Sequence, residues 1–474
     1  MKCLSLLLCL CSFTIAAAAE PLPAAPSGPP VQEKPKPPPP QVQISVQLDW
    51  IKVPHLTANQ LVRQRMKHCR EANDLYAAVQ ELLAQKKAER LDLTALSVHS
   101  GQRSKSESIA DKPYPGEHEP ADAGAKINAA GEKTAGPLIP AVPTGFSIRN
   151  TGVTAEVEAT LGASGRAIDL NIAPEWVEHL TDVAWGKGVA EIKQPVFGAM
   201  KLYTQIATVS GAWQLAGLFT PPAAAAAGKP PGSFPLPADR VFLFVRASVP
   251  ALPNAKDPPP QELPRQVMVL AEWIDMEAAT AASLLAKYPG FSGNPALRQD
   301  LELMITDGRA SLLQTAALLV RGGQRSKIES VIEYPFPQEM NSPSGGSVPV
   351  KDKPGQSPLD VPGISTGMTP VTYSGFAFRN VGTTMEAETT ISEAGDAIEL
   401  NLQPTLDFHA GLLRFGKGDS EVTQPRFQSL KPSVQILLMA NKPAMTASFD
   451  MPGKDAAVPG ARGRKVLFFV RGIR

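Results

Sequence analysis

The chain has 474 residues, of which 43% are hydrophobic, and its 46 Lys and Arg nearly balance its 45 Asp and Glu to leave a net charge of +1. A balance this close gives no electrostatic basis for binding nucleic acid. The length suffices for roughly two to four domains with ordinary hydrophobic cores.

The first predicted element is a secretory signal peptide, residues 1–19. A basic start and a Leu-rich apolar stretch are followed by small residues before Glu20, which is the pattern that signal peptidase accepts. We therefore expect an exported protein. Three of the four cysteines leave with this peptide, so the mature chain keeps Cys69 alone and forms no intramolecular disulfide.

A proline-rich linker, residues 20–41, comes next, and its composition favours an extended polyproline conformation. Beyond it, apolar side chains alternate with polar ones over residues 42–50, which predicts a half-buried strand. The same opening recurs at residues 267–273, where it marks the start of a second copy of the whole pattern.

The chain contains an internal duplication. Seven segments of the first half recur in the second half in unchanged order, at offsets between 222 and 230 residues. The matches are DWIKV with EWIDM, GQRSK with GQRSK, GFSIRNTG with GFAFRNVG, AIDLNIAP with AIELNLQP, WGKG with FGKG, QPVF with QPRF, and VFLFVR with VLFFVR. A repeat this long exceeds a solenoid unit, so we predict two domains, residues 42–249 and 265–474, joined by a second proline-rich linker, residues 250–264.

Each repeat is predicted to open with a strand, continue with helices and a second strand, and end in antiparallel hairpins. Helical spacing falls within residues 61–83 and again within 278–304, and the later pattern is β. Two Gly/Pro/Ser-rich stretches, residues 111–143 and 338–370, are expected to be long irregular inserts. The predicted fold class is α+β and β-rich, with two tandem domains, each a small αβ head followed by an antiparallel hairpin sheet.

Three segments of the first repeat resemble the C-terminal secretin domain. GVTAEVEATLGASGRAIDLNIAPE (152–175) is similar to the hairpin of that family, LAGLF (215–219) stands where the family has a Gly-Gly-Leu segment, and RVFLFVRASV (240–249) resembles its closing strand. Secretins are the outer-membrane ring proteins of type II and type III secretion systems and of type IV pili. The resemblance extends over nearly all of both repeats and implies that both domains are secretin-like.

The resemblance implies an exported, non-enzymatic component of a protein secretion or type IV pilus machine, located in the periplasm or the outer membrane. Such a protein would form a ring or join one. Its partners would be further copies of itself or other components of the machine, and contact with the outer membrane is also implied. We expect these contacts to form through open sheet edges, because an unpaired edge is a template for another strand.

The sequence departs from the secretin pattern at the gate. The gate of the family is a Val-Pro-x-Leu-Gly-x-Ile-Pro-x-x-Gly segment. Residues 220–240 of the first repeat and 451–465 of the second stand at this position, and neither matches the segment. Typical secretins also carry one such domain, whereas this chain has two. A second function therefore stays open, that of a periplasmic accessory or binding module that keeps the secretin-like fold and forms no channel.

The repeated GQRSK motif is the candidate site. Gly followed by Gln suits a tight turn between two strands, and the basic residues after it are candidates for a weak contact with anionic lipid or lipopolysaccharide. The predicted turn residues are Gly101, Gln102, Gly323 and Gln324, and the predicted anionic contacts are Arg103, Lys105, Arg325 and Lys327. We interpret the recurrence of the motif as a consequence of the duplication, which needs no ligand.

No catalytic, cofactor or metal site is predicted. The six histidines lack paired ligand spacing, and only His118 lies in a carboxylate-rich patch, where a weak surface cation contact is conceivable. Glu156 with Glu158, and Glu386 with Glu388, share strand faces, but we interpret them as solvated side chains rather than an acid–base pair. We therefore expect a protein that is not an enzyme.

Overall fold

The computed structural model describes residues 42–66, 68, 69, 71–127, 129, 133–163, 165–222, 239–249, 263–288, 294–344, 368–451 and 463–474. Val42–Arg474 form one compact unit. The predicted signal peptide at 1–19 and the linker at 20–41 lie outside the described residues, as does the second linker up to residue 262. Within the described part of the chain, no helix is both long and apolar enough to cross a membrane.

Over its described residues, the first repeat contains two α-helices, ten strands and one short 3-10 helix. In chain order these are β1 (Gln43–Pro54), α1 (His55–Arg65), α2 (Asn73–Ala84), β2 (Glu89–His99), β3 (Gln102–Glu119), β4 (Asp122–Ile127), β5 (Lys133–Ile139), β6 (Val142–Leu161), β7 (Ala167–Trp185), η1 (Gly188–Ala190), β8 (Ile192–Val209), β9 (Trp213–Phe219) and β10 (Asp239–Ser248). The order follows the prediction: a strand, helices, a strand and then hairpins.

Over the residues that the structure describes, the second repeat follows the same order, and β16 with β17 takes the place of β8. Its elements are β11 (Gln266–Glu277), α3 (Ala278–Lys287), α4 (Pro295–Thr306), β12 (Ala310–Arg321), β13 (Arg325–Asn341), β14 (Thr372–Ile391), β15 (Ala397–Phe415), η2 (Gly418–Ser420), β16 (Val422–Leu430), β17 (Val434–Met439), β18 (Pro443–Asp450) and β19 (Arg464–Ile473). The predicted β-rich α+β class is confirmed.

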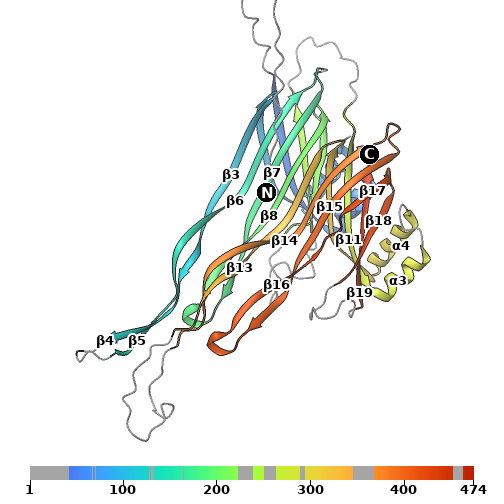
Figure 1. Cartoon of the computed structure of the whole chain (residues 1–474). Helices are drawn as coiled ribbons and strands as arrows, with labels where there is room; N and C mark the ends of the chain where they lie inside the picture. The colour runs from blue at the N-terminus through green and yellow to red at the C-terminus, as the bar shows by residue number, and fades with distance from the viewer. Residues whose placement is uncertain are drawn as a thin grey trace, which may run out of the picture. The chain divides into compact units, whose positions relative to one another are not determined.

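Strands from both repeats share two large antiparallel sheets (Figure 1). The first, here called the head sheet, has the order β18-β19-β11-β12-β9-β10-β1-β2. The second, the hairpin sheet, runs β3-β6-β7-β8-β13-β14-β15-β16, with β17 also beside β15. A further pairing of Gly375 on β14 with Glu117 on β3 returns the hairpin sheet onto its first strand.

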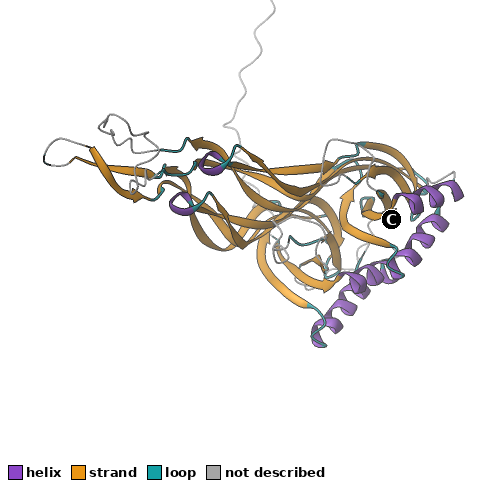
Figure 2. Ribbon diagram, turned by 90° about the horizontal axis from the view of Figure 1, so that it is seen from below, coloured by secondary structure: helices purple, strands orange, loops and turns teal. Residues whose placement is uncertain are grey.

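One large hydrophobic core lies between the two sheets. The hairpin residues that the alternation predicts to face inward are all buried: Ile168, Leu170, Ile172, Ile398, Leu400 and Leu402. Trp50 and Trp273, at matching positions of β1 and β11, are also fully buried. Figure 2 shows the α-helices along one side, at the end opposite the long β hairpins. The core is therefore built jointly by both repeats.

The expectation of an irregular insert at residues 111–143 was wrong. Strand β3 continues to Glu119, β6 begins at Val142, and the β4–β5 hairpin lies between them. Pro113 and Pro115 are tolerated because β3 pairs with β6 on one side and meets β14 only at Glu117 on the other. In the second repeat β13 continues to Asn341, and residues 345–367 lie outside the described residues.

Candidate functional site

The repeated GQRSK motif forms the turn that leads from the head sheet into the hairpin sheet. Gly101 and Gly323 have φ angles of +79° and +76°, in the left-handed region that favours glycine. The Gly101 amide donates to the Ala159 carbonyl at 2.8 Å, and the Gly323 amide donates to the Thr389 carbonyl at 2.7 Å. Both turns are thus tied to the same hairpin position in their own repeats.

The two glutamines of the motif lie just beyond these glycines. Gln102 is the first residue of β3 and pairs with Ala159 of β6. The Gln324 amide donates to the Arg321 carbonyl at 3.0 Å, which closes the turn after β12. Both glutamines therefore take part in the turn through their backbone atoms.

The basic residues of the first motif lie beside carboxylates of the neighbouring strand. Arg103 lies 2.8 Å from Glu156 and 3.6 Å from Glu158, both on β6. Lys105 lies 2.6 Å from Glu107 on its own strand, and this hydrogen bond raises the pKa of the Lys105 ammonium group. The cations and the carboxylates that the sequence suggested separately thus form one surface cluster.

The second repeat has the same arrangement. Arg325 lies 3.8 Å from Glu388, and Lys327 lies 2.7 Å from Glu329 and 3.7 Å from Glu386. The hydrogen bond to Glu329 raises the pKa of Lys327. Pairs this exposed contribute little to stability, because water screens them. An anionic surface would have to compete with these carboxylates, and contact with anionic lipid stays a prediction.

The junction between the repeats, here called the repeat seam, is a second candidate site. In the hairpin sheet, β8 of the first repeat pairs with β13 of the second, with residues 197–203 opposite 327–333. In the head sheet, β9 of the first repeat pairs with β12 of the second at Leu218 opposite Ala317. In both sheets a late strand of the first repeat thus meets an early strand of the second.

Buried polar side chains cross the seam. The Thr204 hydroxyl of β8 donates to the Leu319 carbonyl at 2.5 Å and lies 3.0 Å from the Ser326 hydroxyl. The Gln266 side chain makes two hydrogen bonds of 3.1 Å with the backbone of Ala207, one as acceptor and one as donor. A buried polar group costs free energy unless it is paired, so these bonds fix the register of the two repeats.

A cluster of four charges spans the seam in the hairpin sheet. Arg149 of β6 donates to both carboxylate oxygens of Glu333 on β13, at 2.9 and 2.8 Å, and to Glu175 on β7 at 2.9 Å. Lys201 of β8 lies 3.2 Å from Glu175. Burial alone would raise the pKa of the Glu175 carboxyl, but Arg149 and Lys201 hold it below its usual value.

Aromatic packing also joins the repeats. Trp185, at the end of β7, is only 4% exposed. Its ring centroid lies 6.0 Å from that of Tyr373, 6.4 Å from Tyr334 and 6.5 Å from Phe376, all in the second repeat. Aromatic pairs at such distances stabilise a contact beyond the area they bury. Trp185 of the first repeat is thus buried among aromatic side chains of the second repeat.

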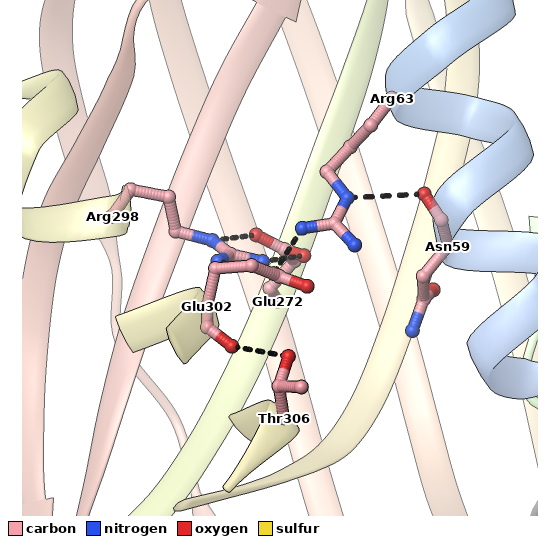
Figure 3. A network of polar contacts seen from close by, with 6 residues as sticks. All are labelled: Asn59, Arg63, Glu272, Arg298, Glu302 and Thr306. Atoms are coloured by element: carbon pink, nitrogen blue, oxygen red, sulfur yellow. Dashed lines mark hydrogen bonds and ion pairs between the residues drawn. The ribbon is translucent and has the colours of Figure 1, made fainter. Parts of the chain in front are cut away.

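The helical heads meet in a third layer of the seam (Figure 3). Arg298 of α4 donates to both oxygens of Glu272 at 2.9 and 2.8 Å, and to Glu302 at 3.0 Å. Glu302 also forms an ion pair with Arg63, which belongs to α1 of the first repeat. Burial alone would raise the pKa of Glu272, but Arg298 lowers it. The buried carboxylate is therefore held in its charged form.

Sequence reasoning did not find the repeat seam. Arg149 and Trp185 lie in matching motifs, but the pattern of a repeat does not say which of its edges meet. The duplication is the feature of the sequence that could have indicated a seam, since two like units in one chain can join through unlike edges. Matching positions can then be compared for burial once the junction is known.

The structure does not support a metal site at His118. This side chain is 7% exposed and lies against Phe376, with 6.0 Å between the ring centroids, so it is not part of a surface cation contact. Burial lowers the pKa of His118. Among the described residues, no group of three or more His, Cys, Asp or Glu side chains is placed to hold a metal ion.

A pocket of about 410 Å3 lies against α3 and α4. Its polar lining consists of Thr280, Ser283, Lys287, Asp300 and Arg309. Lys287 and Asp300 are paired at 2.7 Å, and the Tyr288 hydroxyl donates to Asp300 at 2.6 Å. These groups can hydrogen bond to a small polar molecule, but most of their charge is already neutralised within the pocket.

No family model matches the chain, and no curated protein matches its sequence. Among solved structures, the chain is similar to the type II secretin GspD from enteropathogenic Escherichia coli, with 11% identity over 44% of this chain and 69% of that one. The TM-score is 0.21. A likeness at that level carries no argument about function, which must come from the geometry of this chain.

Proposed function

We propose that this chain is an exported, non-enzymatic structural component of the cell envelope. In this proposal it is a secretin-like protein that forms a ring, or joins one, in a protein secretion or type IV pilus machine. The periplasm or the outer membrane is its proposed location. Its proposed partners are further copies of itself or other components of that machine, reached through sheet edges.

One observation carries the proposal: the two repeats join through unlike edges in both sheets. β8 meets β13 in the hairpin sheet, and β9 meets β12 in the head sheet. When two units join through unlike edges, the pair still has one free edge of each kind, so a further unit can join in the same way. Contacts of this type generate rings when the rotation closes, and filaments when it does not.

A periplasmic accessory or binding module is the second candidate. The pocket of about 410 Å3 against α3 and α4 favours it, because its Lys287, Asp300 and Arg309 side chains offer charged and hydrogen-bonding groups to a small ligand. The absence of a secretin gate motif from residues 220–240 and 451–465 points the same way. In this role the chain would be a soluble monomer.

The test expresses the full chain, including residues 1–19, in a bacterium with an outer membrane. Cells are fractionated, and a detergent extract of the envelope is imaged by electron microscopy. The proposal expects processed protein in the envelope fraction and ring-shaped multimers in the extract. A processed, monomeric periplasmic protein would support the accessory module instead, and protein retained in the cytoplasm would contradict both.

A further inference from the structure

We propose that the repeat seam is the template for a contact between copies of this chain. The end of the second repeat in one copy would dock on the start of the first repeat in the next, in the geometry with which the first repeat now meets the second. The inference names the partner and the contacting surfaces, and it rests on the proposed function for its biological setting.

The sheet edges left open are those the proposal needs. The head sheet ends with β2 at one side and β18 at the other, which match β12 and β9 of the seam. The hairpin sheet has β3 at one end and β16 with β17 at the other, which match β13 and β8. The open edges at one end of the molecule therefore match the first-repeat strands of the seam, and those at the other end match the second-repeat strands.

The strongest support is a pair of aromatic residues exposed at the two ends. At the seam, Trp185 of the first repeat is 4% exposed and packs against Phe376 of the second. The residue matching Trp185 is Phe415, which is 55% exposed, and the residue matching Phe376 is Phe146, which is 65% exposed. Docking of one copy on the next would bring Phe415 onto Phe146 and cover both.

A second apolar pair follows the same rule. Val331 on β13 is 2% exposed and faces Ala199 of β8 across the seam. Its match in the first repeat is Ile109 on the open edge of β3, which is 39% exposed. The residue matching Ala199 is Ser429 on β16. The register of the seam therefore places Ile109 of one copy opposite Ser429 of the previous one.

The charges at the two ends are complementary. At the seam, Glu333 receives Arg149, with Lys201 3.9 Å away. Arg379 on β14 and Lys431 after β16 match these two cations. Each lies 3.9 Å from Asp407, and Arg379 also lies over the Phe427 ring at 4.9 Å. Asp111 on β3 matches Glu333, is exposed, and forms no ion pair among the described residues.

The strand pairing between copies is expected to be shorter than at the seam. In the first repeat β8 is continuous, whereas in the second the matching stretch is divided into β16 and β17 by Pro432 and its neighbours. Proline has no amide proton to donate to a ladder. The expected pairing on β16 is therefore residues 427–430 opposite 108–111 of the next copy. The single pairing of β3 with β14 at Glu117 lies outside this stretch.

The test is site-directed crosslinking of the purified mature chain in which Cys69 is replaced by Ser. Phe146→Cys and Phe415→Cys are made in separate preparations and treated with a short bismaleimide, alone and mixed. We expect crosslinked dimers in the mixture at a level about tenfold above either variant alone, a difference that reports unlike surfaces. Leu56→Cys, on the exposed face of α1, replaces Phe146→Cys in the control mixture, where no such increase is expected.

A charge reversal gives the second measurement. Asp111→Arg should weaken association of the mature chain about tenfold in sedimentation experiments, and a partner copy carrying Arg379→Asp should restore it. A variant that fails to fold is recognised by its circular dichroism, and the Phe415→Cys mixture then decides alone. Crosslinking of Phe146→Cys with itself would overturn the inference, because it indicates a two-fold contact between like edges.

The outcome separates this inference from the proposed function. Envelope rings that do not crosslink between positions 146 and 415 would overturn the inference and leave the proposed function standing. Head-to-tail crosslinks in a protein that never reaches the envelope would do the reverse. A chain that stays monomeric at the highest soluble concentration would overturn the inference.

Discussion

The two repeats place equivalent side chains in opposite environments. Trp185 of the first repeat is buried against the second, whereas Phe415 at the matching position is more than half exposed. Val331 of the second repeat is buried, and its match Ile109 is not. The difference arises because each repeat contacts the other through one edge only. The matching residues at its opposite edge therefore stay exposed. Equivalence of fold therefore does not bring equivalence of burial.

The largest difference is expected between Trp185→Ala and Phe415→Ala. Removal of the buried indole should lower the free energy of unfolding by about 3–5 kcal/mol, because it opens a cavity in the seam. The exposed phenyl should cost the monomer under about 1 kcal/mol. Denaturant unfolding of dilute protein measures both. Equal losses for the two variants would show that the repeats do not differ in this way.

A second contrast lies between Arg298 and Tyr76, which occupy matching helix positions. Arg298 pairs with buried Glu272, whereas the Tyr76 hydroxyl donates to Asp49, which Arg90 also contacts through two further bonds. Arg298→Met should cost about 3–5 kcal/mol, because it leaves a buried carboxylate without its partner.

Tyr76→Phe is the matched control for that change. It should cost about 1 kcal/mol, because Asp49 keeps its bonds to Arg90. Thermal unfolding followed by circular dichroism ranks the two variants. A larger loss for Tyr76→Phe than for Arg298→Met would contradict the assignment of Arg298 as the main partner of Glu272.

His409 and His179 provide a contrast in pH dependence. Burial lowers the pKa of His409 to about 4. The unfolded chain binds this proton below about pH 6.5 and the folded chain does not, so stability is present above that pH and falls as the pH drops toward 4, by up to about 3 kcal/mol. His409→Gln should flatten this part of the profile.

The matched control is His179→Gln, which alters the equivalent position in the first repeat. His179 is more exposed and contacts Asp182 at 2.8 Å. The variant should keep the acid-dependent loss, because His409 is intact. Urea midpoints measured from pH 7 to pH 4 test this, and an unchanged slope in His409→Gln would contradict the effect of burial.

Small effects are also expected at the repeated turn. Gly101→Ala and Gly323→Ala should each cost about 1 kcal/mol, because an L side chain rarely adopts φ near +79° or +76°. An added Cβ meets no atom within 4 Å at either glycine, so no steric clash adds to this cost. Similar losses in calorimetry are expected in both repeats. A change in binding without a loss of stability would revive the motif as a ligand site.

The duplication and the hairpins could be predicted from sequence because both depend on local pattern. Period-two alternation gave the inward positions of both hairpins, and matched motifs gave the two copies. The insert at 111–143 was misread because its Gly and Pro content outweighed a weak alternation, although prolines such as Pro113 are tolerated on a strand with one free edge.

The seam could not be predicted, because it depends on which strand edges meet across more than a hundred residues of chain. The motif WGKG, which carries Trp185, was used to align the two repeats, and Tyr373, which this Trp contacts, lies 188 positions further along the sequence. Likewise, the cations of GQRSK and the carboxylates of β6 were weighed separately. Only the register of β3 with β6 places Arg103 opposite Glu158.

The most direct test of head-to-tail assembly is to count repeats and chains in the same particle. Electron microscopy of the assembled protein gives the number of equivalent repeats, and mass photometry gives the number of chains. The account predicts two similar repeats per chain, with matching contacts between neighbouring repeats within a chain and between chains, so that the repeat count is twice the chain count. Closed dimers with a two-fold axis would contradict it.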